Sequence, residues 1–110
     1  MERIVEQNLL YDFYGDLLTD HQKRIYERAV FEDLSLKELS EEYGITRQGV
    51  HDLIKRCDKI LNEYENKLHM VERFTRIKAF VKDIDSKAET MEGSMAEDIH
   101  KLCREIMESL

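Results

Sequence analysis

The sequence predicts an all-α protein, and three observations support this prediction. The 110 residues contain no proline and only four glycines, so residues that form turns are scarce. Capping-box patterns, with Ser or Thr three positions before Glu or Gln, indicate helix starts at Thr19, Ser35 and Ser94. Apolar residues recur every three or four positions, as in helices with one buried face. The expected helices span residues 3–17, 20–31, 36–43, 47–72, 75–92 and 95–109.

The first expected helix has an apolar face that is wide enough to pack on the helices that follow it. This face consists of Val5, Leu9, Leu10, Phe13, Leu17 and Leu18. The second and third expected helices begin after Thr19 and Ser35, whose hydroxyls would accept hydrogen bonds from backbone amides of the first turn.

Residues 36–56 satisfy the steric demands of a helix-turn-helix. Gly44 stands where the turn needs a left-handed backbone, and Ser40 is small where the second helix crosses the first. Thr46 is an N-cap without an acidic partner three positions later. The positions expected to face the core are Leu39, Tyr43, Ile45, Val50, Leu53 and Ile54.

The fourth expected helix carries apolar residues spaced alternately by four and three, which is typical of a helix that packs along its whole length. These residues are Val50, Ile54, Cys57, Leu61, Tyr64, Leu68 and Val71. The same spacing continues to Leu110, with a break at Gly93. We therefore expect a C-terminal helical hairpin or bundle, closed within the chain or against a second copy, and we predict a homodimer.

The predicted organisation is one compact domain with two parts. Residues 1–72 form a helix-turn-helix head with a long fourth helix, and residues 73–110 form a helical extension packed on the head or on a second subunit.

The net charge of −7 is distributed unevenly. Residues 46–82 carry +4, whereas residues 1–45 carry −6 and residues 83–110 carry −5. Because neutralisation of phosphates supplies most non-specific DNA affinity, this balance argues against tight non-specific binding.

Several classes of function find no support in the sequence. Cys57 and Cys103 lack the spacing of a zinc or redox site, so we interpret both as small buried apolar residues and predict no metal and no cofactor. No phosphate-binding glycine loop or catalytic pairing is recognisable, so we predict no enzyme. No run of about 18 apolar residues and no basic N-terminal leader is present, so we expect a cytoplasmic protein without a membrane segment.

Two resemblances add to this reading. The segment "LSLKELSEEYGITRQGVHDLIKR" resembles the promoter-reading fourth region of bacterial sigma factors. Residues 9–68 resemble the YlxM-like family of small helix-turn-helix proteins, notably in "YDFYGDLLT", "DLSLKELSEEYGITRQ" and "IKRCDKILNEYE". The resemblance implies a sigma-like four-helix head, a DNA-binding regulatory role, and participation in the signal recognition particle (SRP) pathway through that particle's protein or RNA component.

The resemblance to sigma factors also extends to individual positions of the expected reading helix. Thr46 and Arg47 match the sigma pattern, in which this arginine contacts DNA. Sigma factors often have glutamate, arginine, arginine and glutamine at the four positions that are occupied here by Gln48, Gly49, His51 and Asp52. Two positive charges and one bidentate donor are therefore missing.

If DNA is the ligand, Arg47 is the best base reader, because a guanidinium can pair with guanine, and Gln48 could read adenine. Asp52 could accept only from the amino group of cytosine, or else it is repelled by the DNA backbone. The residues expected to neutralise phosphates are Lys55, Arg56 and Lys59.

Structural alternatives exist for several of these residues. Arg47 could be a solvated charge, Gly49 is better interpreted as a replacement for alanine, and His51 as a solvated residue with phosphate contact as the alternative. A second basic patch could hold phosphates or form a solvated face at a turn. It consists of Lys59, Lys67, Arg73, Arg76, Lys78 and Lys82.

Two hypotheses for function result from these observations. The first is a DNA-binding regulatory protein that takes part in the SRP pathway. The second is a protein- or RNA-interaction module of that pathway, in which the helix-turn-helix fold remains and base reading is lost. Asp52 and the acidity of residues 1–45 favour the second hypothesis, and Arg47 favours the first.

Overall fold

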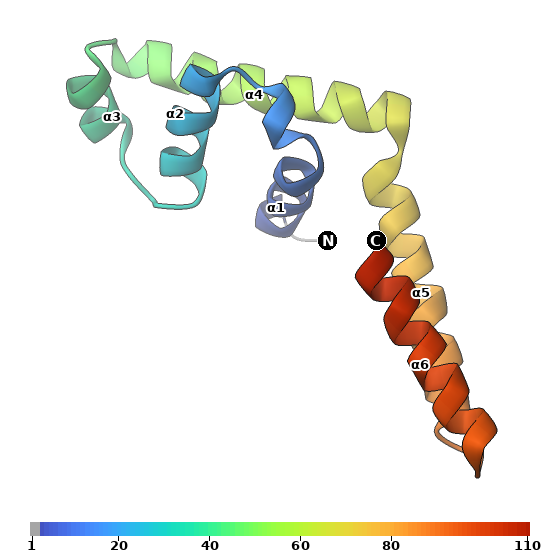
Figure 1. Cartoon of the computed structure of the whole chain (residues 1–110). Helices are drawn as coiled ribbons and strands as arrows, with labels where there is room; N and C mark the ends of the chain where they lie inside the picture. The colour runs from blue at the N-terminus through green and yellow to red at the C-terminus, as the bar shows by residue number, and fades with distance from the viewer. Residues whose placement is uncertain (1–2) are drawn as a thin grey trace. The chain divides into compact units, whose positions relative to one another are not determined.

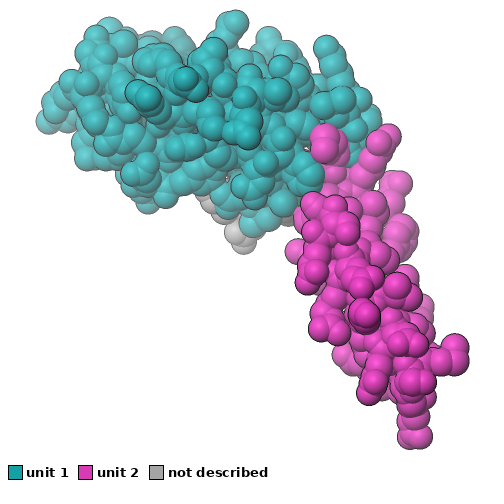
Figure 2. Space-filling view, in the orientation of Figure 1, with its two compact units in different colours: residues 1–69 teal, residues 70–110 magenta. Residues whose placement is uncertain are grey.

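The computed structural model describes residues 3–110, which are almost entirely helical (Figure 1). The elements are α1 (Arg3–Tyr14), the short 3-10 helix η1 (Gly15–Leu17), α2 (Asp20–Val30), α3 (Leu36–Tyr43), α4 (Arg47–Leu68), α5 (Met70–Ala88) and α6 (Ser94–Ser109). No β-strand occurs within residues 3–110, so the all-α prediction is confirmed. The chain forms two compact units (Figure 2): the first unit ends at His69, and the second unit spans Met70–Leu110.

Two of the three predicted capping boxes begin helices of the first unit. The Thr19 hydroxyl accepts from the Gln22 amide at 3.2 Å, and the Gln22 side chain accepts from the Thr19 amide at 3.0 Å. Ser35 and Glu38 make the equivalent pair at 3.1 and 3.2 Å. Each box satisfies two amides that lack partners within the helix, so α2 and α3 begin where the sequence predicts.

The turn of the helix-turn-helix has the predicted geometry. Gly44 ends α3 with φ 67° and ψ 32°, a left-handed conformation that suits glycine. The amides of Gly44 and Ile45 both donate to the Ser40 carbonyl, at 3.0 and 3.2 Å. The Ser40 hydroxyl in turn donates to the Ile45 carbonyl, so this small residue also fixes the turn.

The core of the motif lies where α2, α3 and α4 meet. Ile25, Leu39 and Val50 contribute one fully buried side chain from each helix. Partly buried residues pack around them, namely Ala29, Leu34, Tyr43, Ile45, Leu53 and Ile54. Every position predicted to face the core of the helix-turn-helix therefore does so.

Tyrosines hydrogen-bonded to carboxylates join α1, α2 and α4, which the sequence did not predict. The Tyr14 hydroxyl donates to Glu65 at 2.6 Å, and the Tyr26 hydroxyl donates to Asp58 at 2.7 Å. Both tyrosine rings are almost completely buried. Part of the acidic excess of the first unit therefore serves to satisfy buried hydroxyls rather than to cover the surface.

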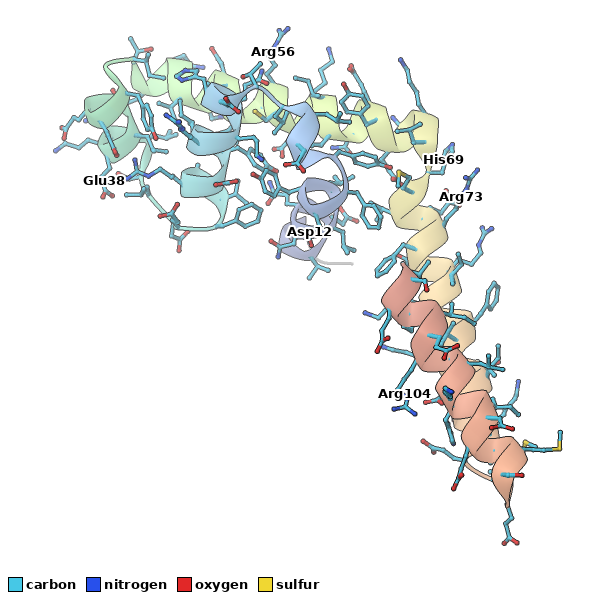
Figure 3. All side chains as sticks on the ribbon, in the orientation of Figure 1. Asp12, Glu38, Arg56, His69, Arg73 and Arg104 are labelled. Atoms are coloured by element: carbon cyan, nitrogen blue, oxygen red, sulfur yellow. The ribbon has the colours of Figure 1, made fainter. Side chains whose placement is uncertain are left out.

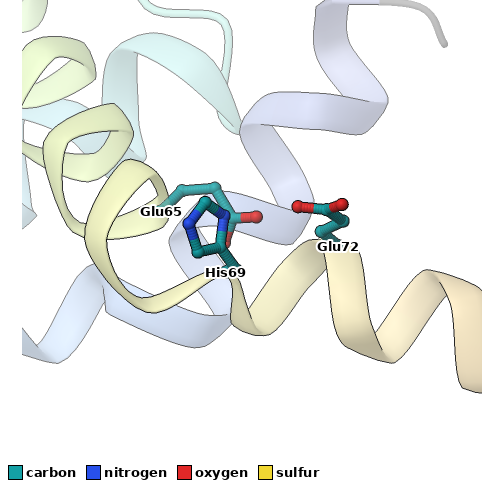
Figure 4. A group of neighbouring side chains, drawn as sticks. All are labelled: Glu65, His69 and Glu72. Carbon is teal, nitrogen blue, oxygen red and sulfur yellow. The ribbon is translucent and has the colours of Figure 1, made fainter.

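The prediction that the fourth helix continues to residue 72 is wrong. α4 ends at Leu68, and His69 adopts a left-handed conformation with φ 54° and ψ 30°. Its amide donates to the Glu65 carbonyl at 2.8 Å, as in other left-handed helix ends. The His69 side chain lies beside that of Glu65 at this end of α4 (Figure 4). No glycine or proline marks this end, and the apolar spacing continues through it, so the periodicity gave no sign of the break.

The second unit is a helical hairpin made of α5 and α6 (Figure 1). α5 spans Met70–Ala88 rather than the predicted residues 75–92. The capping box predicted at Ser94 is wrong, because Gly93, with φ 91°, is the N-cap and makes no side-chain cap hydrogen bond. The buried side chains between the two helices are Val81, Ala88, Ala96 and Cys103.

Candidate nucleic-acid interface

The start of α4 is fixed by its cap and by its contact with the core. The Thr46 hydroxyl accepts from the Gly49 amide at 2.9 Å, so α4 begins at Arg47. One turn later, Val50 is buried against Ile25 and Leu39. The first turns of α4 therefore have a defined rotation about the helix axis, and this rotation decides which side chains face outward.

The exposed face of α4 can be assigned from its buried face. Val50, Cys57 and Leu61 are buried on one side, and successive residues lie about 100° apart. Arg56 lies at a margin of the opposite face and projects away from α1 and α2 (Figure 3). Arg47 is exposed on the first turn, but it lies about 60° from the buried direction, on the other side of α4 from Arg56. The residues nearest the centre of the exposed face are Gln48, Asp52, Lys55 and Lys59.

Four cations of this face are available to a ligand. Among the described residues, no side chain makes a hydrogen bond or an ion pair with them; they are Arg47, Lys55, Arg56 and Lys59. Arg28, on α2, differs from them because it pairs with Glu42 and donates to the Tyr43 hydroxyl at 3.2 Å. We call the four unpaired cations together with Gln48 and Asp52 the α4 face.

Gln48 and Asp52 contact each other within this face. The Gln48 amide nitrogen donates to the Asp52 carboxylate at 2.8 Å, and both side chains are exposed. Such a pair, four positions apart on a helix, stabilises it by only about 0.2–0.5 kcal/mol. The Gln48 amide is therefore engaged in the free protein, but a ligand can release it at little cost.

His51 is only partly solvated. Its side chain is 44% exposed, yet its Nδ1 atom is covered and finds no hydrogen-bond partner among the described residues. The nearest carboxylate oxygen, Asp52 Oδ1, lies 3.7 Å away, beyond hydrogen-bonding distance.

Gly49 lies close to the cap of α4. A Cβ atom at this position would lie 3.1 Å from Thr46 Oγ1, which is tighter than an ordinary contact. The Gly49 amide is also the donor to that same oxygen. The interpretation of Gly49 as a simple replacement for alanine therefore overlooks a contact with the cap.

Apart from Asp52, several acidic residues of the first unit lie away from the α4 face. Asp12 and Glu38 are on the opposite side of this unit from Arg56 (Figure 3). Other carboxylates are engaged inside the unit, such as Glu42 with Arg28 and Asp58 with Tyr26. At least these carboxylates are thus separated from Arg56 or engaged with other side chains.

The residues of the second basic patch are divided between the two units. Lys59 and Lys67 belong to α4, in the first unit, whereas the other four residues belong to α5, in the second. On α5, the helical period places Arg73 (Figure 3) and Arg76 on a different side from Lys78 and Lys82. Arg76 also lies 3.4 Å from the Glu72 carboxylate, and the Lys78 ammonium lies 5.8 Å from the centre of the Phe74 ring.

Both cysteines are buried and unbridged, as the sequence predicts. Burial raises the pKa of the Cys57 thiol to about 11. The thiol is therefore protonated at neutral pH and is not a reactive nucleophile.

Comparison with protein families identifies the relatives of this chain. A model of the family described as "Putative helix-turn-helix protein, YlxM / p13 like" (UPF0122) matches residues 1–102. The chain belongs to this family. The predicted YlxM-like resemblance is thus confirmed, and the family is described by the motif that α3 and α4 form.

Curated UPF0122 relatives share nearly half of the aligned residues. A UPF0122 protein of Desulforamulus reducens is 46% identical over 76 residues, which cover 69% of this chain and 65% of the relative. One of Clostridium acetobutylicum is 44% identical over 87 residues, covering 79% of this chain and 75% of the relative. One of Streptococcus gordonii is 49% identical over 70 residues, covering 64% of each. The aligned part thus spans less than two thirds of the first and third relatives.

None of the helices in residues 3–110 combines the length and the apolar composition needed to cross a membrane.

Proposed function

We propose that this protein binds duplex DNA through the α4 face and acts as a regulator. The observation that carries the proposal is the presence of four exposed cations without partners in the described chain on the second helix of a helix-turn-helix. In such motifs the N-terminal part of this helix contacts base edges in the major groove. Membership of a family described by this motif supports the assignment.

The side chains of the α4 face divide into two roles. Arg47, on the first turn, is placed to pair with guanine, and Gln48 can read adenine once it leaves Asp52. Lys55, Arg56 and Lys59 lie further along α4, where they would neutralise phosphates. Asp52 disfavours phosphate nearby and accepts only from a cytosine amino group.

Duplex binding across a salt series tests this proposal. We expect affinity to fall as salt rises, and Arg47→Ala to lose sequence preference, at about 1–3 kcal/mol for the base contact. Lys55→Ala should weaken all duplexes alike and reduce the salt slope by about one. Lys101→Ala, in α6, is the matched control and should change neither property. No duplex binding at low salt would refute the proposal.

A second function is favoured by the Gln48–Asp52 hydrogen bond, which engages a base reader and places a carboxylate on the reading surface. In this alternative the fold serves as a protein- or RNA-interaction module of the SRP pathway, without sequence-specific DNA binding. The same salt series with the particle's RNA and its protein component tests it. Binding to either one, together with absence of duplex binding, would establish the alternative over the first proposal.

The proposal includes four further points. The family resemblance supports a role in the SRP pathway, and we place the protein in the cytoplasm. The motif of the family supports a binding role rather than an enzymatic one. Exposed apolar residues of the second unit support a homodimer.

A further inference from the structure

The second unit carries an apolar face that no described residue covers. Phe80, Met95 and Leu102 are 59%, 68% and 57% exposed, which is unusual for large apolar side chains. Three other exposed apolar residues accompany them on the same two helices. The six residues, which we call the hairpin face, are Ile77, Phe80, Ile84, Met95, Leu102 and Ile106.

These residues lie on one side of the hairpin. On α5, Val81 and Ala88 point toward α6, and the helical period places Ile77, Phe80 and Ile84 together about a quarter turn from that direction. On α6, Ala96 and Cys103 point toward α5, and Met95, Leu102 and Ile106 are again about a quarter turn away. Because the helices run in opposite directions, both rotations lead to the same side, and the face is continuous.

The hairpin buries too little apolar surface between α5 and α6 to be stable by itself. The four buried side chains between its helices are no larger than valine; they are Val81, Ala88, Ala96 and Cys103. Units of roughly 40 residues usually need oligomerisation or cross-links to be stable. Both cysteines are unbridged, so a disulfide does not supply this stability.

Charges beside the hairpin face differ between the two helices. The outer edge along α5 carries Arg73, Arg76 and Lys87 and two carboxylates, Glu72 and Asp83, which pair with Arg76 at 3.4 Å and with Lys87 at 2.9 Å, so this edge retains a small positive excess. The outer edge along α6 is acidic, with Asp98 and Glu105. The face is therefore complementary to a second copy of itself, provided that the α5 edge of one copy meets the α6 edge of the other.

This condition selects one arrangement of two copies. A twofold axis parallel to the hairpin places α5 of each copy over α6 of the other, so opposite charges meet. A twofold axis across the hairpin places α5 over α5, so basic edges meet and repel. We propose that the hairpin face is the interface of a homodimer with the first arrangement, a four-helix bundle with α5 opposite α6 of the partner subunit.

Contacts within the hairpin define the register of this interface. Asp85 contacts His100, and the Cys103 thiol donates to the Val81 carbonyl at 3.8 Å. Lys87 comes two positions after Asp85, and Asp98 comes two positions before His100. Because the helices are antiparallel, Lys87 and Asp98 lie at the same height along the hairpin. A twofold axis parallel to the hairpin preserves these levels, so Lys87 faces Asp98 of the partner subunit at the rim.

The interface rests on the homodimer of the proposed function and is independent of DNA binding by α4. Sedimentation equilibrium of the full chain tests both. We expect a dimer at micromolar concentration, and Leu102→Glu should raise the dimer dissociation constant by about 30-fold or more, because it places an unpaired charge in the interface. Lys101→Glu is the matched control: it lies on α6 away from the hairpin face and should change dissociation little.

A charge exchange tests the register. Lys87→Glu alone and Asp98→Lys alone should each weaken the dimer by about 2- to 5-fold, as expected for exposed ion pairs, and the double variant should recover most of this loss. The pair of Lys87 with Asp83, which Lys87→Glu also breaks, lies within one subunit and is present in monomer and dimer alike, so it should not change dissociation. Circular dichroism at concentrations where each variant is still dimeric should show unchanged helix content, since the substituted side chains are exposed in the single chain. Helix content should fall only as a variant dissociates, because the hairpin alone buries little apolar surface.

The outcomes separate the interface from the homodimer. A monomeric wild-type chain would overturn both. A wild-type dimer that persists in Leu102→Glu would overturn the interface and retain the homodimer. A dimer disrupted by Leu102→Glu but without recovery in the double charge variant would overturn the proposed register.

Discussion

The two units of this protein differ in how they bury apolar surface. In the first unit, large side chains from α1 to α4 are fully buried, including Tyr14, Tyr26, Ile25, Leu39 and Leu61. In the second unit, only small side chains are buried, and larger ones are exposed on the hairpin face. The first unit therefore completes a core from its own helices, whereas the second leaves apolar surface for another partner to cover.

The largest expected effect distinguishes the two kinds of burial. Leu39→Ala should lower the free energy of unfolding by about 2–5 kcal/mol, because it leaves a cavity in a fully packed core. Denaturant unfolding measures this loss, which should not depend on protein concentration. Leu102→Ala, in the second unit, is the control. Its effect should decline as the protein is diluted, and an equal loss for both variants at every concentration would contradict the comparison.

Alkaline pH should destabilise the first unit selectively. Burial raises the pKa of Cys57 to about 11, and burial together with the hydrogen bond to Asp58 raises the pKa of Tyr26 well above its usual range. A group whose pKa is higher in the folded chain loses its stabilisation as pH rises from its unfolded to its folded pKa. The free energy of unfolding should therefore fall from about pH 9 upward, by about 1.4 kcal/mol per pH unit for each such group.

Denaturant titrations between pH 7 and pH 11 measure this decline. Cys57→Ala should reduce the slope between about pH 9 and pH 11, whatever its effect at neutral pH. Cys103→Ala, in the second unit, serves as the control. If the free energy of unfolding of the wild-type chain did not change between pH 7 and pH 11, the raised pKa values of Cys57 and Tyr26 would be contradicted.

The smallest expected changes in stability come from substitutions at the starts of α4 and α6. Thr46→Ala should destabilise the first unit by about 1 kcal/mol, since the Thr46 hydroxyl caps α4. Ser94→Ala, at the start of α6, should change stability by less than about 0.5 kcal/mol, since the α6 cap is Gly93 and makes no side-chain hydrogen bond. Thermal unfolding of both variants measures the difference. A similar loss of stability in the two variants would indicate that the Ser94 side chain does cap α6.

Features with local causes were predictable from the sequence. Gly44, Thr19 and Ser35 act through residues within five positions, so their patterns predicted the turn and two helix starts. The left-handed His69 was not predictable, because neither glycine nor proline signals it. The tyrosine hydrogen bonds were not predictable either, because Tyr14 and Glu65 are 51 positions apart and only the fold brings them together.

The membership of the candidate site remains a prediction, whereas its geometry was only partly predictable. Arg47, Lys55 and Arg56 are each exposed on α4, but the helical period puts Arg47 and Arg56 on opposite sides of the helix. The Gln48–Asp52 hydrogen bond follows the spacing of four that joins side chains on a helix, so this spacing could have revealed it. The division of the basic patch between α4 and α5 depends on the end of α4, which the apolar spacing concealed.

The two buried cysteines fall one to each unit, Cys57 in α4 and Cys103 in α6. Neither thiol can react with an alkylating reagent until the helices around it separate. The chain thus contains two internal reporters of local opening, and their alkylation rates measure the opening of the two units separately in one sample.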